Sequence, residues 1–259
     1  MEQVTNPHDK FFKQVLSREE VARDFVSHYL PEEVRECLDV DSLIVSKDTF
    51  VDQELREYFS DLLYSIDIKG GGPAYVYLLF EHKSFSDPVT GFHVLRYMVR
   101  IWELCQKRGE TRPLPPIVPM VVYHGKGRWK VGLAFHDLFD LPEALGRLVP
   151  NFDYLLCDLT RYSDEEIKGA VSLRVCLLLL KHIFGDDLPE KLPEILGLLK
   201  GLSHQRSGLE YLETVLRYVA SGASQIQREE MIKHVKDVFE DQQGGDMMAT
   251  LAEEWIEEG

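Results

Sequence analysis

The sequence has few cysteines, and none of them lies in a short paired motif. Its 259 residues include four cysteines, which are scattered singly along the chain: Cys37, Cys105, Cys157 and Cys176. A structural zinc site usually needs Cys-x-x-Cys pairs, and a disulfide framework needs a higher density of cysteines, so neither is indicated. Single cysteines of this kind are typical of proteins in a reducing compartment, which favours a cytoplasmic setting.

Long apolar runs are missing as well. The longest candidate, at residues 175–180, is ended by Lys181 and His182, whereas a membrane-spanning helix needs roughly 18 apolar residues or more. The first ten residues are polar and lack the basic and then apolar pattern of a secretion signal. With 44% apolar residues the chain can still bury a core, so we expect a globular protein with no membrane partner.

Positive charge is scarce, but it is concentrated in one place. The chain has 29 Lys and Arg residues against 44 Asp and Glu residues, a net charge of −15, which by itself disfavours a nucleic-acid partner. By segment the net charge is −9 over 1–88, +6 over 89–135, −4 over 136–236 and −8 over 237–259. The segment 89–135 is therefore where contact with an anionic partner is expected.

The apolar periodicity predicts a mixed α/β core followed by helices. Over residues 1–162 we expect, in order, a helix at 17–30 opened by a Ser17–Glu20 capping box, a strand at 39–46, a hairpin of strands 62–68 and 74–80, a helix at 89–107 and a strand at 117–123. A second capping box at Ser163–Glu166 opens a helical region over 163–259, with helices at about 164–184, 190–202, 206–221 and 226–241. The fold class is thus α/β, a mixed sheet flanked by helices, with a C-terminal helical region.

Two carboxylates flank the predicted hairpin. If the hairpin turns about Gly71, Asp61 lies opposite Glu81, and side-chain carbons of opposed residues are about 4.5–5.5 Å apart. Two such carboxylates suit a Mg²⁺ ion, and Lys83 projects from the same face as Glu81 because strand side chains alternate. The alternative is that the strand simply emerges into water at Glu81, which then pairs with Lys83 on the surface.

The helix at 89–107 carries a basic stripe. On a helical wheel the following residues fall within about 60° of one another, with Tyr97 at the edge: His93, Arg96, Arg100 and Lys107. The opposite side should pack on the sheet and consists of Phe92, Leu95, Val99 and Trp102. A basic stripe beside a metal site suits a phosphate backbone, although most charged stripes are solvated helix faces. His124, at the end of strand 117–123, is either a phosphate ligand or proton donor, or a structural histidine.

Several short motifs together resemble the bacterial recombination-promoting nuclease family, whose members are also described as transposases. They are Ser60-Asp61-Leu62-Leu63-Tyr64, Glu81-His82-Lys83-Ser84, Tyr123-His124-Gly125 with Trp129, His8 to Lys13, and Arg96-Tyr97-Met98. The resemblance covers residues 7–160 strongly and the helical remainder loosely. The family is assigned to the PD-(D/E)xK superfamily of restriction-like nucleases, and the predicted strand order agrees with that core.

The resemblance implies a catalytic set and a cofactor. Asp61 and Glu81 resemble the motif's metal ligands, together with the backbone carbonyl of His82, and Lys83 resembles the lysine that orients or activates the attacking water. The implied cofactor is Mg²⁺, with Mn²⁺ as a substitute. Many relatives carry glutamine where this chain has Lys83, and the motif's proline is replaced by Ser60. The implied activity is a metal-dependent endodeoxyribonuclease linked to DNA recombination or genome defence.

Two other functions compete with this interpretation. A catalytically weak nuclease fold that only binds nucleic acid or protein is favoured by the net charge of −15. A transposase proper needs a basic recognition helix in a helix-turn-helix, and the sequence shows none. The acidic C-terminal segment 237–259 has apolar residues at helical spacing (Met247, Leu251, Trp255), so it is expected to pack within the chain, to form a homodimer through the helical region, or to cover the basic groove as a lid.

Overall fold

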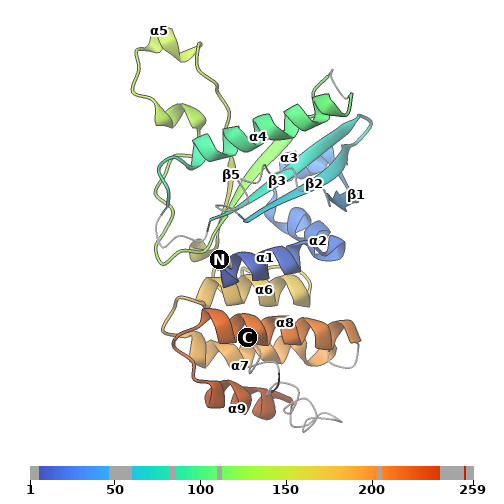
Figure 1. Ribbon diagram of the computed structural model, residues 1–259, viewed down its shortest axis with the longest axis vertical. Helices are drawn as coiled ribbons and strands as arrows, with labels where there is room; N and C mark the ends of the chain where they lie inside the picture. Colours follow the sequence, from blue (N-terminus) through green and yellow to red (C-terminus); the bar gives the residue numbers. More distant parts are fainter. Residues whose placement is uncertain are drawn as a thin grey trace. The chain divides into compact units, whose positions relative to one another are not determined.

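The computed structural model describes residues 6–46, 60–81, 86–109, 113–202, 206–239 and 254 (Figure 1). Internal contacts divide the chain into two units, one formed by Leu16–Arg161 and the other by Met1–Val15 with Tyr162–Gly259. The sequence-based division placed all of residues 1–162 in the core, so the assignment of the first 15 residues was wrong. Aromatic packing accounts for the difference, because the ring of Phe11 stacks on that of Tyr218 at a centroid distance of 4.0 Å.

The first unit contains a five-stranded mixed sheet in the order β1-β2-β3-β4-β5. Its elements are α2 (Glu19–Tyr29), α3 (Glu32–Cys37), β1 (Leu38–Val45), β2 (Ser60–Ile68), β3 (Pro73–Glu81), α4 (Thr90–Lys107), β4 (Ile117–Tyr123), η1 (Phe135–Leu138), α5 (Glu143–Gly146), β5 (Leu155–Asp158) and η2 (Leu159–Arg161). Strands β1 to β3 pair antiparallel, and β3 to β5 pair parallel. The predicted mixed α/β fold is confirmed, while α3 and β5 were not predicted.

The β2–β3 hairpin is present, but its register differs from the prediction. The turn is closed by two backbone bonds, from Gly71 N–H to Ile68 O (2.9 Å) and from Ile68 N–H to Gly72 O (3.0 Å). Gly70 has a φ of +70°, which glycine adopts at little cost. The pairing therefore centres on Gly70, and Asp61 lies opposite Leu79 rather than opposite Glu81. The error is two residues, which leaves every position on its expected face because the strand period is two.

The sheet has one apolar face against α4 and another on the side of α2. Odd-numbered strand residues such as Tyr77 and Tyr123 belong to one core cluster with Tyr97 and Ile101 of α4, and Figure 1 shows α4 crossing this part of the sheet. On the other face the Tyr64 hydroxyl donates a hydrogen bond of 2.8 Å to Leu16 O, just before α2. Because side chains alternate along each strand, the parity of a residue number indicates its face in β2, β3 and β4, whereas in β5 the register pairs even numbers with odd ones and the parity is reversed.

The buried side of α4 is not the predicted one. Phe92 and Val99 are 54% and 42% exposed, although both were expected to pack on the sheet. The buried residues are Thr90, Gly91, Val94, Tyr97, Met98, Ile101 and Cys105. The helix has two adjacent apolar sides, one containing Phe92 and Val99 and a wider one centred between Val94 and Ile101. The sheet covers the wider one. The predicted face was thus rotated by about a third of a turn.

The second unit is helical, as predicted for the C-terminal region. It comprises α1 (Pro7–Leu16, apart from its last residue), α6 (Val171–His182), α7 (Leu188–Gly197), η3 (Leu198–Leu202), α8 (Arg206–Gly222) and α9 (Arg228–Phe239). Asn6 caps α1 by accepting a 3.0 Å hydrogen bond from His8 N–H, and His8 Nδ1 lies 2.8 Å from the Tyr218 hydroxyl. The His8–Lys13 motif therefore anchors the first helix in this unit. No helix in the described ranges is long and apolar enough to cross a membrane.

The two predicted capping boxes have different outcomes. Ser163 and Glu166 exchange the expected hydrogen bonds, at 2.8 and 3.3 Å, but these close a turn instead of opening a helix. Gly169, with a φ of +119°, breaks the helical path, so α6 begins only at Val171. The box at Ser17–Glu20 is not formed, because Arg18 is the extended residue before α2 and no side chain caps its amides.

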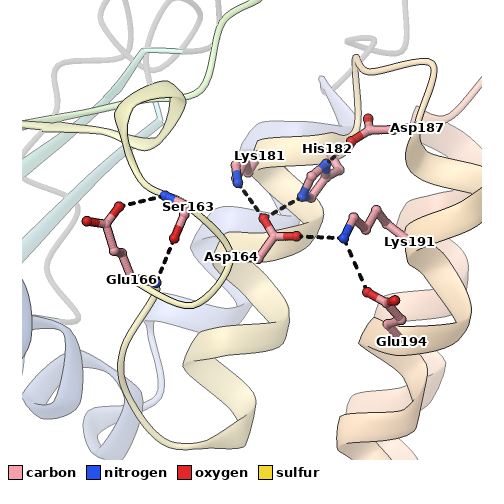
Figure 2. Close-up of polar contacts among 8 residues, drawn as sticks. All are labelled: Ser163, Asp164, Glu166, Lys181, His182, Asp187, Lys191 and Glu194. Atoms are coloured by element: carbon pink, nitrogen blue, oxygen red, sulfur yellow. Dashed lines mark hydrogen bonds and ion pairs between the residues drawn. The ribbon is translucent and has the colours of Figure 1, made fainter.

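Asp164, within the same turn, contacts basic side chains from α6 and α7 (Figure 2). Its Oδ1 contacts the Lys181 ammonium and lies 2.8 Å from His182 Nε2, and its Oδ2 lies 3.2 Å from Lys191 Nζ. His182 Nδ1 is in turn 2.8 Å from Asp187 Oδ2. This Asp164 cluster fastens the turn at 163–166 to two helices of its own unit.

Candidate active site

Three parallel strands end side by side at one edge of the sheet. Glu81 at the end of β3 pairs with Tyr123 at the end of β4, which pairs with Asp158 at the end of β5. Ligands of α/β sheets commonly bind outside the carboxyl ends of such strands. The edge therefore has the position of an active site.

Asp61 lies close to Glu81 at this edge. Asp61 pairs with Leu79, and Glu81 is two residues further along β3, so the two acidic positions are diagonal neighbours across the hairpin. Backbone positions of this kind are about 7–8 Å apart, and both have the parity of the face that α4 covers. Two carboxylate residues at diagonal positions fit the donor set of a hard divalent cation.

The remaining ligand positions lie at the limit of the described structure. Only the backbone of Asp61 and Glu81 is described, and His82 and Lys83 lie outside the described residues. Across the part of the chain whose side chains are described, no group of three or more His, Cys, Asp or Glu residues could hold a metal ion. The metal site and the catalytic set of Asp61, Glu81 and Lys83 therefore stay predictions.

Asp158 is a buried residue at this edge that sequence reasoning missed. Its side chain is 2% exposed and accepts hydrogen bonds from Trp129 N–H (3.1 Å), from Thr160 N–H (3.0 Å) and its hydroxyl (2.7 Å), and from Arg161 Nε (3.2 Å). The carboxylate thereby ties the loop after β4 to the end of β5. The available signal was Asp158-Leu159-Thr160, an Asx-turn pattern directly after an apolar strand.

Most of the predicted basic stripe is on the outer surface of α4. Arg96 and Lys107 are exposed, and Arg100 Nη1 lies 2.8 Å from Glu103 Oε2 on the same surface. His93 is partly covered, and its Nε2 lies 3.8 Å from Asp87 Oδ2. An outer helix face with these residues is compatible with a phosphate backbone, and their role as DNA contacts remains a prediction.

Two predicted contacts lie inside the protein instead. Tyr97 is 3% exposed and stacks on Tyr77 with ring centroids 5.1 Å apart, so the prediction that it edges the basic surface was wrong. His124 is 1% exposed and directly follows Tyr123, the last residue of β4. The structure favours the structural interpretation of this histidine over a phosphate contact.

Other titratable groups near β5 are core residues. Burial raises the pKa of Tyr154 to about 12, and its hydroxyl donates a 2.7 Å hydrogen bond to Gly132 O. Burial also raises the pKa of the Cys157 thiol, with a smaller contribution from neighbouring Asp158. Both groups stay protonated at neutral pH, so neither is suited to act there as a base or nucleophile.

Comparison with known proteins agrees with the motifs around this edge. Residues 6–210 match the family described as "Putative transposase, YhgA-like". The chain is 34% identical to recombination-promoting nuclease RpnD of Escherichia coli O157:H7 over 196 residues, covering 75% of each protein. It is 31% identical to recombination-promoting nuclease RpnC of E. coli K12 over 255 residues, covering 98% of this chain and 82% of RpnC.

Not every relative is named as an active enzyme. The inactive recombination-promoting nuclease-like protein RpnE of E. coli K12 is 31% identical over 217 residues, covering 83% of this chain and 70% of RpnE. No solved structure matches the chain significantly. The match over residues 6–210 includes all five strands as well as α6 and α7, and the chain belongs to the YhgA-like transposase family, as a member of the Rpn group of recombination-promoting nuclease proteins.

Proposed function

We propose that this protein is a metal-dependent endodeoxyribonuclease that hydrolyses DNA phosphodiester bonds during recombination or genome defence. The observation that supports it is the diagonal placement of Asp61 and Glu81 at the sheet edge where β3 and β4 end. The names of RpnD and RpnC as recombination-promoting nucleases support the same activity.

The chain's own residues divide the work of the reaction. The carboxylates of Asp61 and Glu81 and the backbone carbonyl of His82 would hold Mg²⁺, or Mn²⁺ in its place, through oxygen ligands. When bound, such an ion neutralises phosphate charge and lowers the pKa of a coordinated water. Lys83 positions the attacking water and stabilises negative charge in the transition state. The outer face of α4, with Arg96, Arg100 and Lys107, holds the DNA backbone by phosphate contacts.

A second function has specific support. RpnE is named as an inactive relative, and the chain's net charge of −15 disfavours close approach to DNA. A nuclease fold that binds nucleic acid or protein without turnover would explain both observations. The two functions differ in one measurable property, the metal-dependent cleavage of DNA.

The first prediction tests that property on supercoiled plasmid. We expect nicking with Mg²⁺ and none with chelator, and we expect Asp61→Ala and Glu81→Ala each to lower the rate by at least about 100-fold, because each removes a proposed metal ligand. Lys83→Ala should leave metal binding intact and lower the rate by about 100-fold. Asp67→Ala is the matched control, since this carboxylate is exposed on the same strand and pairs with Pro73, far from the edge.

The outcomes separate the two functions. Nicking by the Asp61→Ala protein at the wild-type rate would remove the proposed catalytic site. DNA binding by the wild-type protein without any nicking in Mg²⁺ or Mn²⁺ would favour the binding function instead.

A further inference from the structure

Exposed apolar side chains are unevenly distributed over the described part of the chain. Of its nine large hydrophobic side chains that are exposed, eight lie between residues 89 and 148, and the ninth is Ile44. Soluble proteins usually expose such residues singly, so a concentration of them in one stretch indicates a contact surface. The stretch supplies this surface from two elements, α4 and the excursion between β4 and β5.

The first element is the apolar edge of α4. Phe92 and Val99 are seven residues apart, which is two helical turns, and they therefore lie on one line along the helix. Arg96 and Glu103 continue the same surface. The helix as a whole carries three Lys and Arg residues and one Glu, so this apolar edge lies in a net basic setting.

The second element is the arm, residues 136–151. Its base is closed by an antiparallel bridge between Ala134 and Asp153, and the rings of Phe135 and Phe152 stack there at 5.1 Å. Figure 1 shows the arm, with α5 in it, extending away from the sheet. None of the residues of α5 is buried, and Leu145 and Leu148 are 48% and 71% exposed.

The two elements both expose apolar side chains, and their net charges are opposite in sign. The arm carries three acidic residues and one basic residue, whereas α4 carries one acidic and three basic residues. An acidic arm is a poor partner for DNA, because like charges would meet there. Its apolar residues and its charge instead suit the surface of α4, which its own copy leaves exposed.

We infer that the arm of one copy docks on the apolar edge of α4 in a second copy, so that the protein forms a two-fold dimer. Leu145 and Leu148 of each arm cover Phe92 and Val99 of the other copy. The two-fold symmetry repeats this contact, so the dimer interface contains it twice. The inference concerns assembly and does not require DNA cleavage. An arm that covers Phe92 and Val99 would compete with DNA for Arg96, because this residue lies between them on the same side of α4.

Proximity between copies tests the inference directly. Leu148→Cys in a tagged chain and Val99→Cys in an untagged chain, both with Cys37→Ser, are mixed and oxidised with copper phenanthroline. The other three cysteines are buried and should not react. We expect a disulfide-linked species containing both chains, near twice 29.9 kDa. Absence of this mixed species overturns the inference, and an Ile44→Cys chain in place of Val99→Cys is the matched control because Ile44 is also exposed but lies on β1.

Mass in solution supplies a second, independent measurement. By light scattering, the wild type and Ile44→Asp should have about twice the chain mass, and Leu148→Asp and Val99→Asp should each have the chain mass. A mixture of the two variants should recover a dimer, because Val99→Asp keeps an intact arm and Leu148→Asp keeps an intact α4 edge. Recovery also shows that both variants are folded, since an unfolded chain could not form this contact. If both variants have the same mass as the wild type, the inference is overturned. It is also overturned if Leu148→Asp keeps the wild-type mass but binds DNA more weakly, because that result would assign the arm to DNA.

Discussion

At the scale of single residues, Asp164 shows how much one carboxylate can organise. Partial burial alone would raise its pKa, but hydrogen bonds from Lys181 and His182 outweigh burial and hold the pKa well below the ordinary value of 3.8. Lys191, from another helix, contributes in the same direction. The sequence indicates the Ser163–Glu166 turn, but not these partners, which lie 17 to 27 residues further along the chain.

The pKa of Asp164 predicts a pH-dependent stability. A carboxylate with a lowered pKa in the folded state stabilises the fold above its unfolded pKa and loses that contribution as pH falls. We therefore expect Asp164→Asn to lower the free energy of unfolding by about 2 kcal/mol at pH 7, and the difference from wild type to shrink below about pH 4.

Urea denaturation at pH 7 and at pH 3 measures both quantities. Glu194→Gln is the control, because this carboxylate is 72% exposed and lies 3.3 Å from Lys191 Nζ in an i,i+3 surface pair, so its loss should cost no more than about 0.5 kcal/mol. A deficit for Asp164→Asn that is equal at the two pH values would contradict the prediction.

At the scale of elements, sequence patterns locate the elements better than they orient them. The strand at 117–123 has the bounds of β4, and the helix at 89–107 differs from α4 by one residue. α4 has two apolar sides, and periodicity alone did not show which of them the sheet would cover. That choice depends on packing between residues far apart in the sequence, such as the stacked rings of Tyr77 and Tyr97. The hairpin register was similarly set by which glycine occupies the turn, a choice among three consecutive glycines.

The outer surface of α4 gives a prediction for DNA binding. Changing Arg96 and Arg100 to alanine should weaken binding and lower the slope of log affinity against log salt by about 0.9 for each phosphate that the protein no longer neutralises. Arg96 should account for more of the change, since Arg100 already has Glu103 at 2.8 Å. Fluorescence anisotropy across a salt titration provides the slopes.

A basic residue of the helical unit serves as the control. Arg217 in α8 has a comparable ion pair with Glu213 at 2.9 Å, so Arg217→Ala loses the same kind of charge from a different unit. Equal slopes for the wild type and the Arg96 and Arg100 variant would exclude α4 as the DNA contact.

At the scale of the whole molecule, the main feature is that the candidate active site and the acidic C-terminal residues lie in different parts of the chain. The candidate active site lies in the α/β unit, while the segment with the highest density of acidic residues, 237–259, belongs to the other unit and lies almost wholly outside the described residues. The expected homodimer contact and lid of this segment are therefore still predictions. The sequence could predict the family core because its motifs lie on consecutive strands, whereas the C-terminal contacts depend on partners that no local pattern specifies.

Deleting residues 244–259 tests the role of the tail. The deletion removes five acidic residues and changes the net charge from −15 to −10, so DNA affinity should rise at low salt, while plasmid nicking continues because the proposed ligands are untouched. Loss of nicking in a folded truncated protein would show that the tail completes the site. Light scattering on the same protein reports whether the tail also contributes to a dimer interface.

The closed base of the arm has a consequence for how this fold can vary. Because residues 133–135 and 152–154 pair with one another before the chain enters β5, the start of β5 is held in place whatever lies between them. The Asp158 carboxylate then secures the far end of the same strand. The arm is consequently a position at which the length of the chain can change, or a reporter domain can be inserted, without displacing the strand ends of the candidate active site, provided that the Leu145 and Leu148 contacts of the inferred dimer are kept.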